Sequence, residues 1–414
     1  MTDAITAPAN ADRAAYQDIL ALLDHALPIV LIVKLSGAWF HPTFTPSDTA
    51  PGIGLINALF LAFCLYGTLR LLFRQPLALV MAEPAYIALL TLAAIGALVS
   101  VSPSNTLGLL RTATLFLGAC VFLRYRFTPL YILRLFAAVM GTMMLLSLIA
   151  AAATPLGVMP GFDAGRWRGV FNHKNTLGEN AAATMLVCGG LLLTGQSGRY
   201  WLAGAALLAA ICLSMSGSAT AQAAAAMGAV LMVAAWSIVR LRVRRNQGFW
   251  LLLGLMVLIA CGAYLVTEFV AQTLGRDMTF TGRTDIWLQF MHFAQQRPWS
   301  GWGWATISTT DSMLPLIRQT LALPYIQTPH SGYLTLLVEL GIPGLLAFLS
   351  WLAINLVVAS RRAIIGCEGK AIIRLALLGA LIVHSGFEST SGALPSLWLF
   401  LLFAANARLR VRWH

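Results

Sequence analysis

Charged residues are scarce in this sequence. Asp, Glu, Lys and Arg together make up only 10% of its 414 residues, and the acidic residues number 15. Soluble globular domains carry about 25% charged residues, so the composition excludes a soluble enzyme of this length. The six cysteines show neither the Cys/His spacing of a metal site nor a placement for an outward-facing disulfide. We therefore expect no metal and no cofactor.

Long apolar stretches dominate what is present, because 59% of the residues are hydrophobic. About 20 apolar residues are needed to cross a bilayer as a helix. The longest stretches are 52–72, 106–124, 128–151, 176–195, 219–240, 249–271 and 333–359. Shorter or interrupted ones are 85–101, 200–216, 371–388, 393–407 and 18–40, the last containing Asp24, His25 and Lys34. These stretches predict an all-α polytopic membrane protein, with about twelve transmembrane helices in a single transmembrane domain, 1–414.

The basic residues predict how the chain crosses the membrane. Lys and Arg number 27, which gives a net charge of +12. If both termini are cytoplasmic, eighteen of these residues fall in inward connections or tails, seven in outward connections and two within spans. This agrees with the enrichment of Lys and Arg in cytoplasmic loops. The excess charge therefore indicates orientation, with membrane lipid as a partner and no nucleic acid.

Two predicted outward segments break this charge pattern. The first is 152–175, and the second is 272–330, a large periplasmic loop between helices 9 and 10. Six of the seven outward basic residues lie in or near their motifs: Arg166, Arg168, Lys174, Arg276, Arg283 and Arg297. Arginines hold phosphate by bidentate hydrogen bonds, and a helix N-terminus near Lys174 would add backbone N–H donors. An anion is expected to bind here, although Arg166 and Lys174 could instead pair with lipid headgroups.

Several other polar residues near these segments have two interpretations. His330 is either an interfacial anchor or a base that removes a proton from a hydroxyl nucleophile, and His173 is a second candidate. Glu339 and Glu388 lie in or beside predicted spans. Buried ionisable groups in membranes are functional candidates, but each could equally pair with a neighbouring arginine.

Four ordered motifs resemble the O-antigen ligase/polymerase superfamily. They are Arg168-Gly-Val-Phe-Asn-His-Lys-Asn-Thr-Leu-Gly178, Gly282-Arg-Thr-Asp-Ile-Trp287, Pro298-Trp-Ser-Gly-Trp-Gly303, and His330-Ser331 with Gly341-Ile-Pro-Gly344. The resemblance implies a GT-C-like glycosyltransferase of the bacterial inner membrane, with its active site facing the periplasm. The implied donor is a glycan carried on undecaprenyl pyrophosphate. Because the sequence contains no zinc-protease motif and no Cys/His metal spacing, we expect its transfer to need no metal.

The resemblance also implies roles for individual residues. Arg168 and Arg283 would bind the pyrophosphate and stabilise its developing charge, while His330 would position or deprotonate the acceptor hydroxyl. These three are the predicted catalytic residues. The residues predicted to bind the pyrophosphate or the glycan are Arg166, Lys174, His173, Asn175 and Trp302.

The sequence leaves three functions open. The first motif resembles exopolysaccharide polymerases of the ExoQ type, which favours polymerisation of repeat units into exopolysaccharide or O-antigen. The spacing from His330 to Gly341 and Gly344 fits equally well a ligase that transfers a finished chain to lipid A core. A transporter of lipid-linked sugars is the third possibility, but its expected paired repeats and midplane carboxylates are missing.

Overall fold

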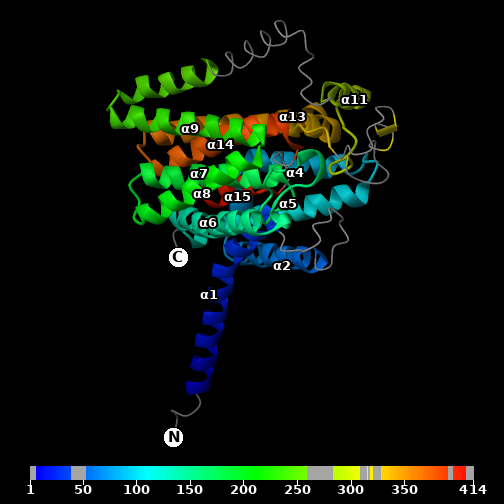
Figure 1. Ribbon diagram of the computed structural model, residues 1–414. Helices are drawn as coiled ribbons and strands as arrows, with labels where there is room; N and C mark the ends of the chain where they lie inside the picture. The colour runs from blue at the N-terminus through cyan, green and yellow to red at the C-terminus, as the bar shows by residue number, and fades with distance from the viewer. Residues whose placement is uncertain are drawn as a thin grey trace.

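A computed structural model describes residues 6–38, 53–258, 283–307, 315, 318–319, 328–389 and 395–406. Within these residues the named elements are all helical. Two isolated antiparallel bridges are also present, one between Ala38 and Phe171 and one between Val158 and Trp167. The elements, shown in Figure 1, are α1 Thr6–Ser36, α2 Ile53–Leu72, α3 Ala78–Ala82, α4 Pro84–Gly96, α5 Pro103–Arg126, α6 Pro129–Ala153, η1 Pro155–Gly157, η2 Gly161–Asp163, α7 Lys174–Leu193, α8 Arg199–Ser216, α9 Ala219–Arg240, α11 Arg283–Gln296, α13 Gly332–Ile364, α14 Gly369–Phe387 and α15 Leu397–Ala404.

Nine helices in the described ranges are long and apolar enough to cross a membrane. The prediction of an all-α polytopic membrane protein is therefore confirmed. The interrupted stretch 18–40 is among them, as the segment Gln17–Ser36 of α1. Two of the twelve predicted spans are shorter in the structure, and a third lies partly outside the described residues. α4 has 13 residues and α15 has eight, while the predicted span 249–271 is helical to residue 258, where the described residues end.

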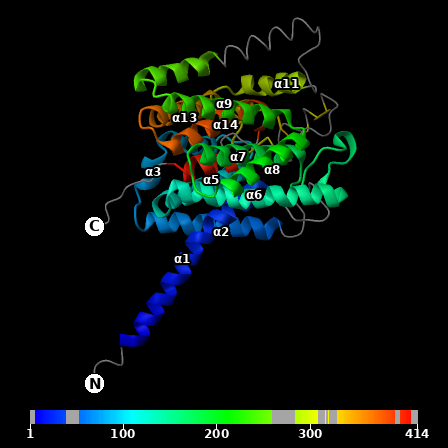
Figure 2. The same cartoon turned by 60° about the vertical axis from the view of Figure 1, so that its left-hand side comes forward.

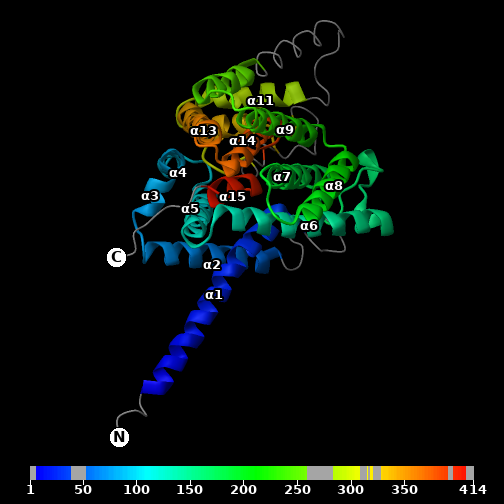
Figure 3. The ribbon, with the colours of Figure 1, turned by 90° about the vertical axis from the view of Figure 1, so that its left-hand side faces the viewer.

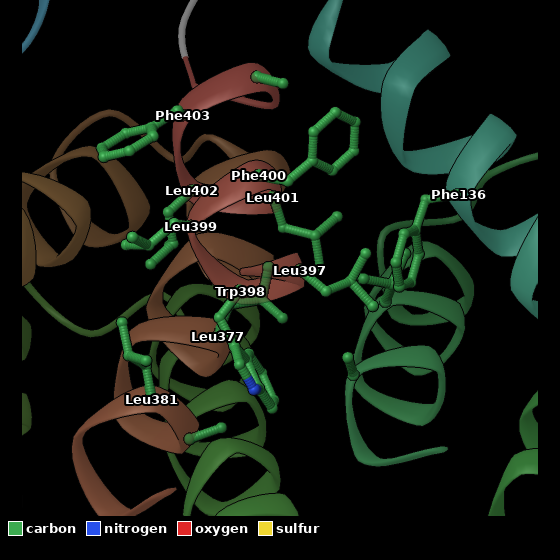
Figure 4. Packing of buried hydrophobic residues seen from close by; sticks show 14 of the residues in the cluster. Phe136, Leu377, Leu381, Leu397, Trp398, Leu399, Phe400, Leu401, Leu402 and Phe403 are labelled. Atoms are coloured by element: carbon green, nitrogen blue, oxygen red, sulfur yellow. The ribbon is translucent and has the colours of Figure 1, made fainter. Parts of the chain in front are cut away.

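The short helix α15 packs inside the bundle. All eight of its residues are buried, with exposed fractions of 2% or less. Figure 4 shows Leu397 and Trp398 among side chains of neighbouring helices, including Leu377 of α14 and Phe136 of α6. Lipid tails are as apolar as leucine, so close van der Waals packing is what holds such a helix in place. An apolar stretch in the sequence cannot distinguish a spanning helix from a buried one.

The two ends of the helices differ in their residues. Arginines occupy the last turns of α2, α5, α9 and α13, which lie together at what we call the arginine end. The connections before α5, α7 and α13 lie at the opposite end, the loop end, at the right of Figure 1. Figures 2 and 3 show the first turns of α1 projecting away from the other helices.

A break in α13 holds part of the loop that precedes it. Gly341 has φ of 67° inside this 33-residue helix. The Ile342 N–H donates to Pro298 O at 2.7 Å and the Trp302 N–H donates to Val338 O at 3.0 Å. A Cβ atom on Gly341 would lie 2.7 Å from Pro298 O. The third and fourth motifs are therefore one structural unit, in which glycine allows the loop backbone to enter the break.

Candidate active site at the loop end

Arg168 is fixed by the loop that connects α6 to α7. Its Nε donates to Leu156 O at 2.7 Å, and its backbone N–H donates to Gly157 O at 2.9 Å. Gly169, with φ of 60°, allows the loop to approach α6, because a Cβ there would lie 2.3 Å from the Ser147 Cβ. Burial lowers the pKa of the Arg168 guanidinium, which nevertheless keeps its charge because an arginine titrates far above neutral pH. The loop thus holds a buried cation.

His173 caps the N-terminus of α7. Its Nδ1 accepts a hydrogen bond from the Asn175 N–H at 3.2 Å. Burial lowers the pKa of His173, which favours the neutral imidazole that this bond requires, with its proton on Nε2. The cap begins α7 at Lys174, so the lysine lies in the first turn, where backbone N–H groups have no acceptor within the helix.

Glu388 links three helices at the loop end. Its Oε1 accepts from Asn175 Nδ2 at 3.1 Å, and its Oε2 lies 3.4 Å from His330 Nδ1. Glu388 is the C-cap of α14, and His330 immediately precedes the N-cap of α13. The next residues are joined as well, since the Ser331 N–H donates to Ser389 Oγ at 3.1 Å. The His330 side chain remains 40% exposed, whereas that of Glu388 is 11% exposed. A held imidazole with an accessible edge can exchange a proton with a bound hydroxyl.

Lys174 completes the group of charges. Its Nζ forms an ion pair with Asp163 Oδ1 at 2.6 Å, with side chains 19% and 24% exposed. Electrostatic interactions join His173 to Asp163, Lys174, Glu388 and His330. We call the following residues the Glu388 cluster: Asp163, His173, Lys174, Asn175, His330 and Glu388.

The other predicted site residues occupy different positions. Arg166 is exposed, and a Cβ on Gly217, between α8 and α9, would lie 2.5 Å from its Nη1. Trp302 donates from Nε1 to Phe293 O at 2.9 Å, and Arg297 lies over its ring at 4.3 Å from the centroid. Trp302 thus ties α11 to the loop before α13. Arg283 is the first residue of α11, and its side chain lies outside the described residues.

The buried carboxylate of Glu339 has a structural partner. Its Oε1 accepts from the Ile307 N–H at 3.2 Å, and the N–H groups of Ala305 and Thr306 also face it. The exposed fraction of Glu339 is 3%. The carboxylate therefore satisfies a turn of the loop backbone, which would otherwise bury donors without acceptors.

Two members of the cluster were less apparent in the sequence. Glu388 was identified only as an ionisable group beside a span, and its partners His330 and Asn175 are remote in sequence. Asp163 was not identified at all. Its one signal is that it is the only acidic residue in the segment 152–175, which also contains basic motif residues.

Comparison with protein families adds a finding to this geometry. Residues 204–349 match the model of a family described as O-antigen ligase. The match supports the O-antigen ligase/polymerase superfamily. The matched region contains Arg283, Trp302 and His330 and ends before Glu388, while the Arg168 loop precedes it. No curated protein matched the chain. The family supports a function of the O-antigen ligase or polymerase type in a multi-pass membrane protein.

Proposed function

We propose that the protein is a glycosyltransferase that polymerises repeat units carried on undecaprenyl pyrophosphate into exopolysaccharide or O-antigen. The observation that carries this proposal is the Glu388 cluster, where an accessible histidine and a lysine at a helix N-terminus lie at one end of an apolar bundle. A lipid-linked donor would place its tail among the helices and its pyrophosphate at their ends. The loop end then faces the periplasm of a bacterial inner membrane, with both termini in the cytoplasm.

His330 and Glu388 supply the proton transfer in this proposal. In this proposal His330 carries a proton on Nδ1 and donates it in a hydrogen bond to Glu388 Oε2. Nε2 is then unprotonated and acts as the base. The acceptor hydroxyl gives its proton to Nε2, and its oxygen forms a bond to the anomeric carbon of the donor. The bond from that carbon to the pyrophosphate oxygen breaks, and undecaprenyl pyrophosphate leaves with the electron pair. Ionised Glu388 stabilises the imidazolium formed.

Basic groups on the α6–α7 connection and on α11 bind the pyrophosphate in this scheme. Arg168 is held by a carbonyl, and Lys174 lies in the first turn of α7, where backbone N–H groups attract anions. Lys174 exchanges its Asp163 partner for a phosphate oxygen. Arg283 and Arg166 add charge from neighbouring segments, and His173, Asn175 and Trp302 contact the glycan or the pyrophosphate. No metal takes part.

The second candidate is a ligase that transfers a finished chain from undecaprenyl pyrophosphate to lipid A core. The family description itself favours it, because the matched family is that of an O-antigen ligase. The first motif, Phe171 to Asn175, favours the polymerase by its resemblance to the ExoQ type. Both reactions use the same donor and leaving group, so only the acceptor distinguishes them.

An acceptor competition tests the proposal. Purified protein receives a lipid-linked repeat unit together with lipid A core. The products are separated by glycan size and by the lipid to which the glycan is attached. Longer glycans on undecaprenyl pyrophosphate support the polymerase, and glycosylated lipid A core supports the ligase. Movement of the intact donor across vesicles without a new glycosidic bond would make the protein a transporter and refute both.

Thiol labelling tests the proposed orientation. Cys367 is exposed at the arginine end, and Ala164 is exposed on the α6–α7 connection. In intact cells, a membrane-impermeant maleimide that crosses the outer membrane should label Ala164→Cys and leave Cys367 unlabelled until the cells are lysed. The reverse pattern would contradict a periplasmic active site.

A further inference from the structure

A cavity of about 230 Å³ lies at the arginine end, remote from the Glu388 cluster. It is formed by α1, α2 and α5 together with the residues that follow α2. Its polar lining consists mainly of Arg70, Arg74, Arg126 and Asp24, and its apolar walls include Leu20 and Phe122. We call this cavity the Asp24 pocket. Basic pockets between transmembrane helices are known to bind the headgroups of anionic lipids.

Asp24 orients two of the three arginines. Its Oδ2 accepts from Arg126 Nε at 2.8 Å, and its Oδ1 lies 3.4 Å from Arg70 Nη1. Tyr66 also donates its hydroxyl to Asp24 Oδ1 at 2.6 Å. The carboxylate is 3% exposed, whereas the side chains of Arg70 and Arg126 are 16% and 40% exposed. The acid is therefore enclosed by its donors, while the guanidinium groups reach the cavity.

Aromatic rings fix the Arg70 guanidinium further. Its Cζ lies 5.6 Å from the ring centroid of Tyr66 and 5.6 Å from that of Phe122. Arg70 Nη1 also donates to Tyr66 Oη at 2.8 Å. An arginine held in this way loses little side-chain entropy when it binds an anion. Enrichment of arginine at the cytoplasmic ends of spans accounts for exposed charges, but it does not account for an enclosed carboxylate that aligns them around a cavity.

The charge balance of the pocket favours an anion with an apolar attachment. Three arginines line the cavity, and Asp24 is the only carboxylate among its lining residues. Leu20, Leu71 and Phe122 provide apolar surface beside these charges. In a chain that crosses a membrane, phosphate next to apolar surface is the chemistry of a phospholipid at the boundary of its headgroup.

We propose that the Asp24 pocket binds the phosphate of an anionic lipid headgroup, in the leaflet opposite the Glu388 cluster. The site is independent of the proposed glycosyl transfer, because its residues belong to other helix ends. A soluble phosphate compound would share the recognition chemistry, so the test must separate the two sources.

The test measures lipid binding to the purified full-length protein in detergent by native mass spectrometry and by the shift of Tm. The probes are dioleoylphosphatidylglycerol, the zwitterionic dioleoylphosphatidylcholine, and glycerol 3-phosphate as the soluble phosphate. We expect phosphatidylglycerol to raise Tm and to bind more tightly than either of the others. Equal binding of glycerol 3-phosphate would assign the pocket to a soluble phosphate and overturn the lipid proposal.

Three variants locate the binding. Arg74 is exposed and Arg240 is an exposed arginine at the same end on α9, outside the pocket. Arg74→Gln should weaken phosphatidylglycerol binding about fivefold, and adding Arg126→Gln should weaken it by roughly a further fivefold. Arg240→Gln should leave the affinity unchanged. Equal losses in Arg74→Gln and Arg240→Gln would show a diffuse basic surface and refute the pocket. Arg74→Gln alone decides this if Arg126→Gln, which removes a partner of buried Asp24, prevents folding.

Discussion

Glu388 Oε2 and His330 Nδ1 lie 3.4 Å apart, although 58 positions separate the two residues in the chain. The second oxygen of the same carboxylate accepts from Asn175 Nδ2 on α7. The carboxylate therefore lies between an imidazole and an amide, which fixes its orientation and that of His330. A carboxylate on Nδ1 selects the tautomer that presents Nε2 to a substrate.

Glu388→Gln should lower kcat for glycan transfer by about 100-fold, at the lower end of the range for acid–base catalysis. The amide cannot stabilise the imidazolium of His330, but it preserves the size of the side chain. KM for the donor should change little, since in the proposed reaction other residues bind the pyrophosphate. Steady-state kinetics of undecaprenyl pyrophosphate release would measure both parameters.

Glu368→Gln is the matched control, because Glu368 is exposed and lies at the arginine end before α14. It should have wild-type kcat. If Glu388→Gln changed only the yield of folded protein and left kcat intact, Glu388 would be a structural residue and not a positioning residue for His330.

Arg168→Lys should lose about as much activity as Arg168→Ala, a factor of about 100 to 1,000 in kcat/KM. The guanidinium is positioned by the hydrogen bond from Nε to Leu156 O at 2.7 Å. A lysine has only one side-chain nitrogen, so it cannot donate to that carbonyl and bind a phosphate in the same way. Arg240→Lys, at an exposed position on α9, is the control. Wild-type activity in Arg168→Lys would show that the position needs only a positive charge.

The cap at His173 predicts a pH dependence of stability. Burial lowers the pKa of His173, so the unfolded protein binds this proton at pH values where the folded protein does not. The stabilisation is complete above the ordinary histidine value of about 6.5 and decreases as the pH falls from there toward the folded pKa. His173→Asn keeps a side-chain cap and removes the titration. Its Tm should decrease less than that of the wild type between about pH 8 and pH 5. If Tm fell equally with pH in the two proteins, the lowered pKa of a capping His173 would be contradicted.

Gly341→Ala should destabilise the protein by more than about 1 kcal/mol, the scale for a non-glycine residue in a strained backbone region. Its φ is 67°, and the new Cβ would approach Pro298 O and Trp299 O. A Cβ added to Gly204 on α8 would meet nothing within 4 Å, so Gly204→Ala should not lower Tm. Thermal unfolding in detergent compares the two. Equal Tm values would mean that the loop does not depend on the break in α13.

Some of the fold follows directly from the sequence. Apolar length predicted nearly all the long helices, including α1, although Asp24 and His25 interrupt its apolar stretch in the sequence. The structure explains these two polar residues, because Asp24 contacts Arg70 and Arg126, and His25 Nδ1 lies 2.8 Å from the Tyr131 hydroxyl. What the sequence could not show is which apolar stretches face protein, as α15 does.

The candidate site was predictable to a similar extent. Lys174 was predicted because its charge departs from the orientation pattern, and His173 and Asn175 were predicted because they lie in the same motif. His330 was predicted from another motif. That these four residues gather in one cluster with Glu388 could not be predicted, since the contacts depend on how α7, α13 and α14 end beside one another. Pairing between helix ends is set by tertiary packing, which has no local sequence signal.

The most direct test of the account is a reaction of purified protein in nanodiscs with a lipid-linked oligosaccharide donor. We predict one undecaprenyl pyrophosphate released for each new glycosidic bond, and neither product with His330→Ala. His292→Ala is the matched control, since His292 is an exposed histidine on α11, and it should retain full activity. Bond formation at the wild-type rate in His330→Ala, with the protein correctly folded, would contradict the assignment of the Glu388 cluster as the active site.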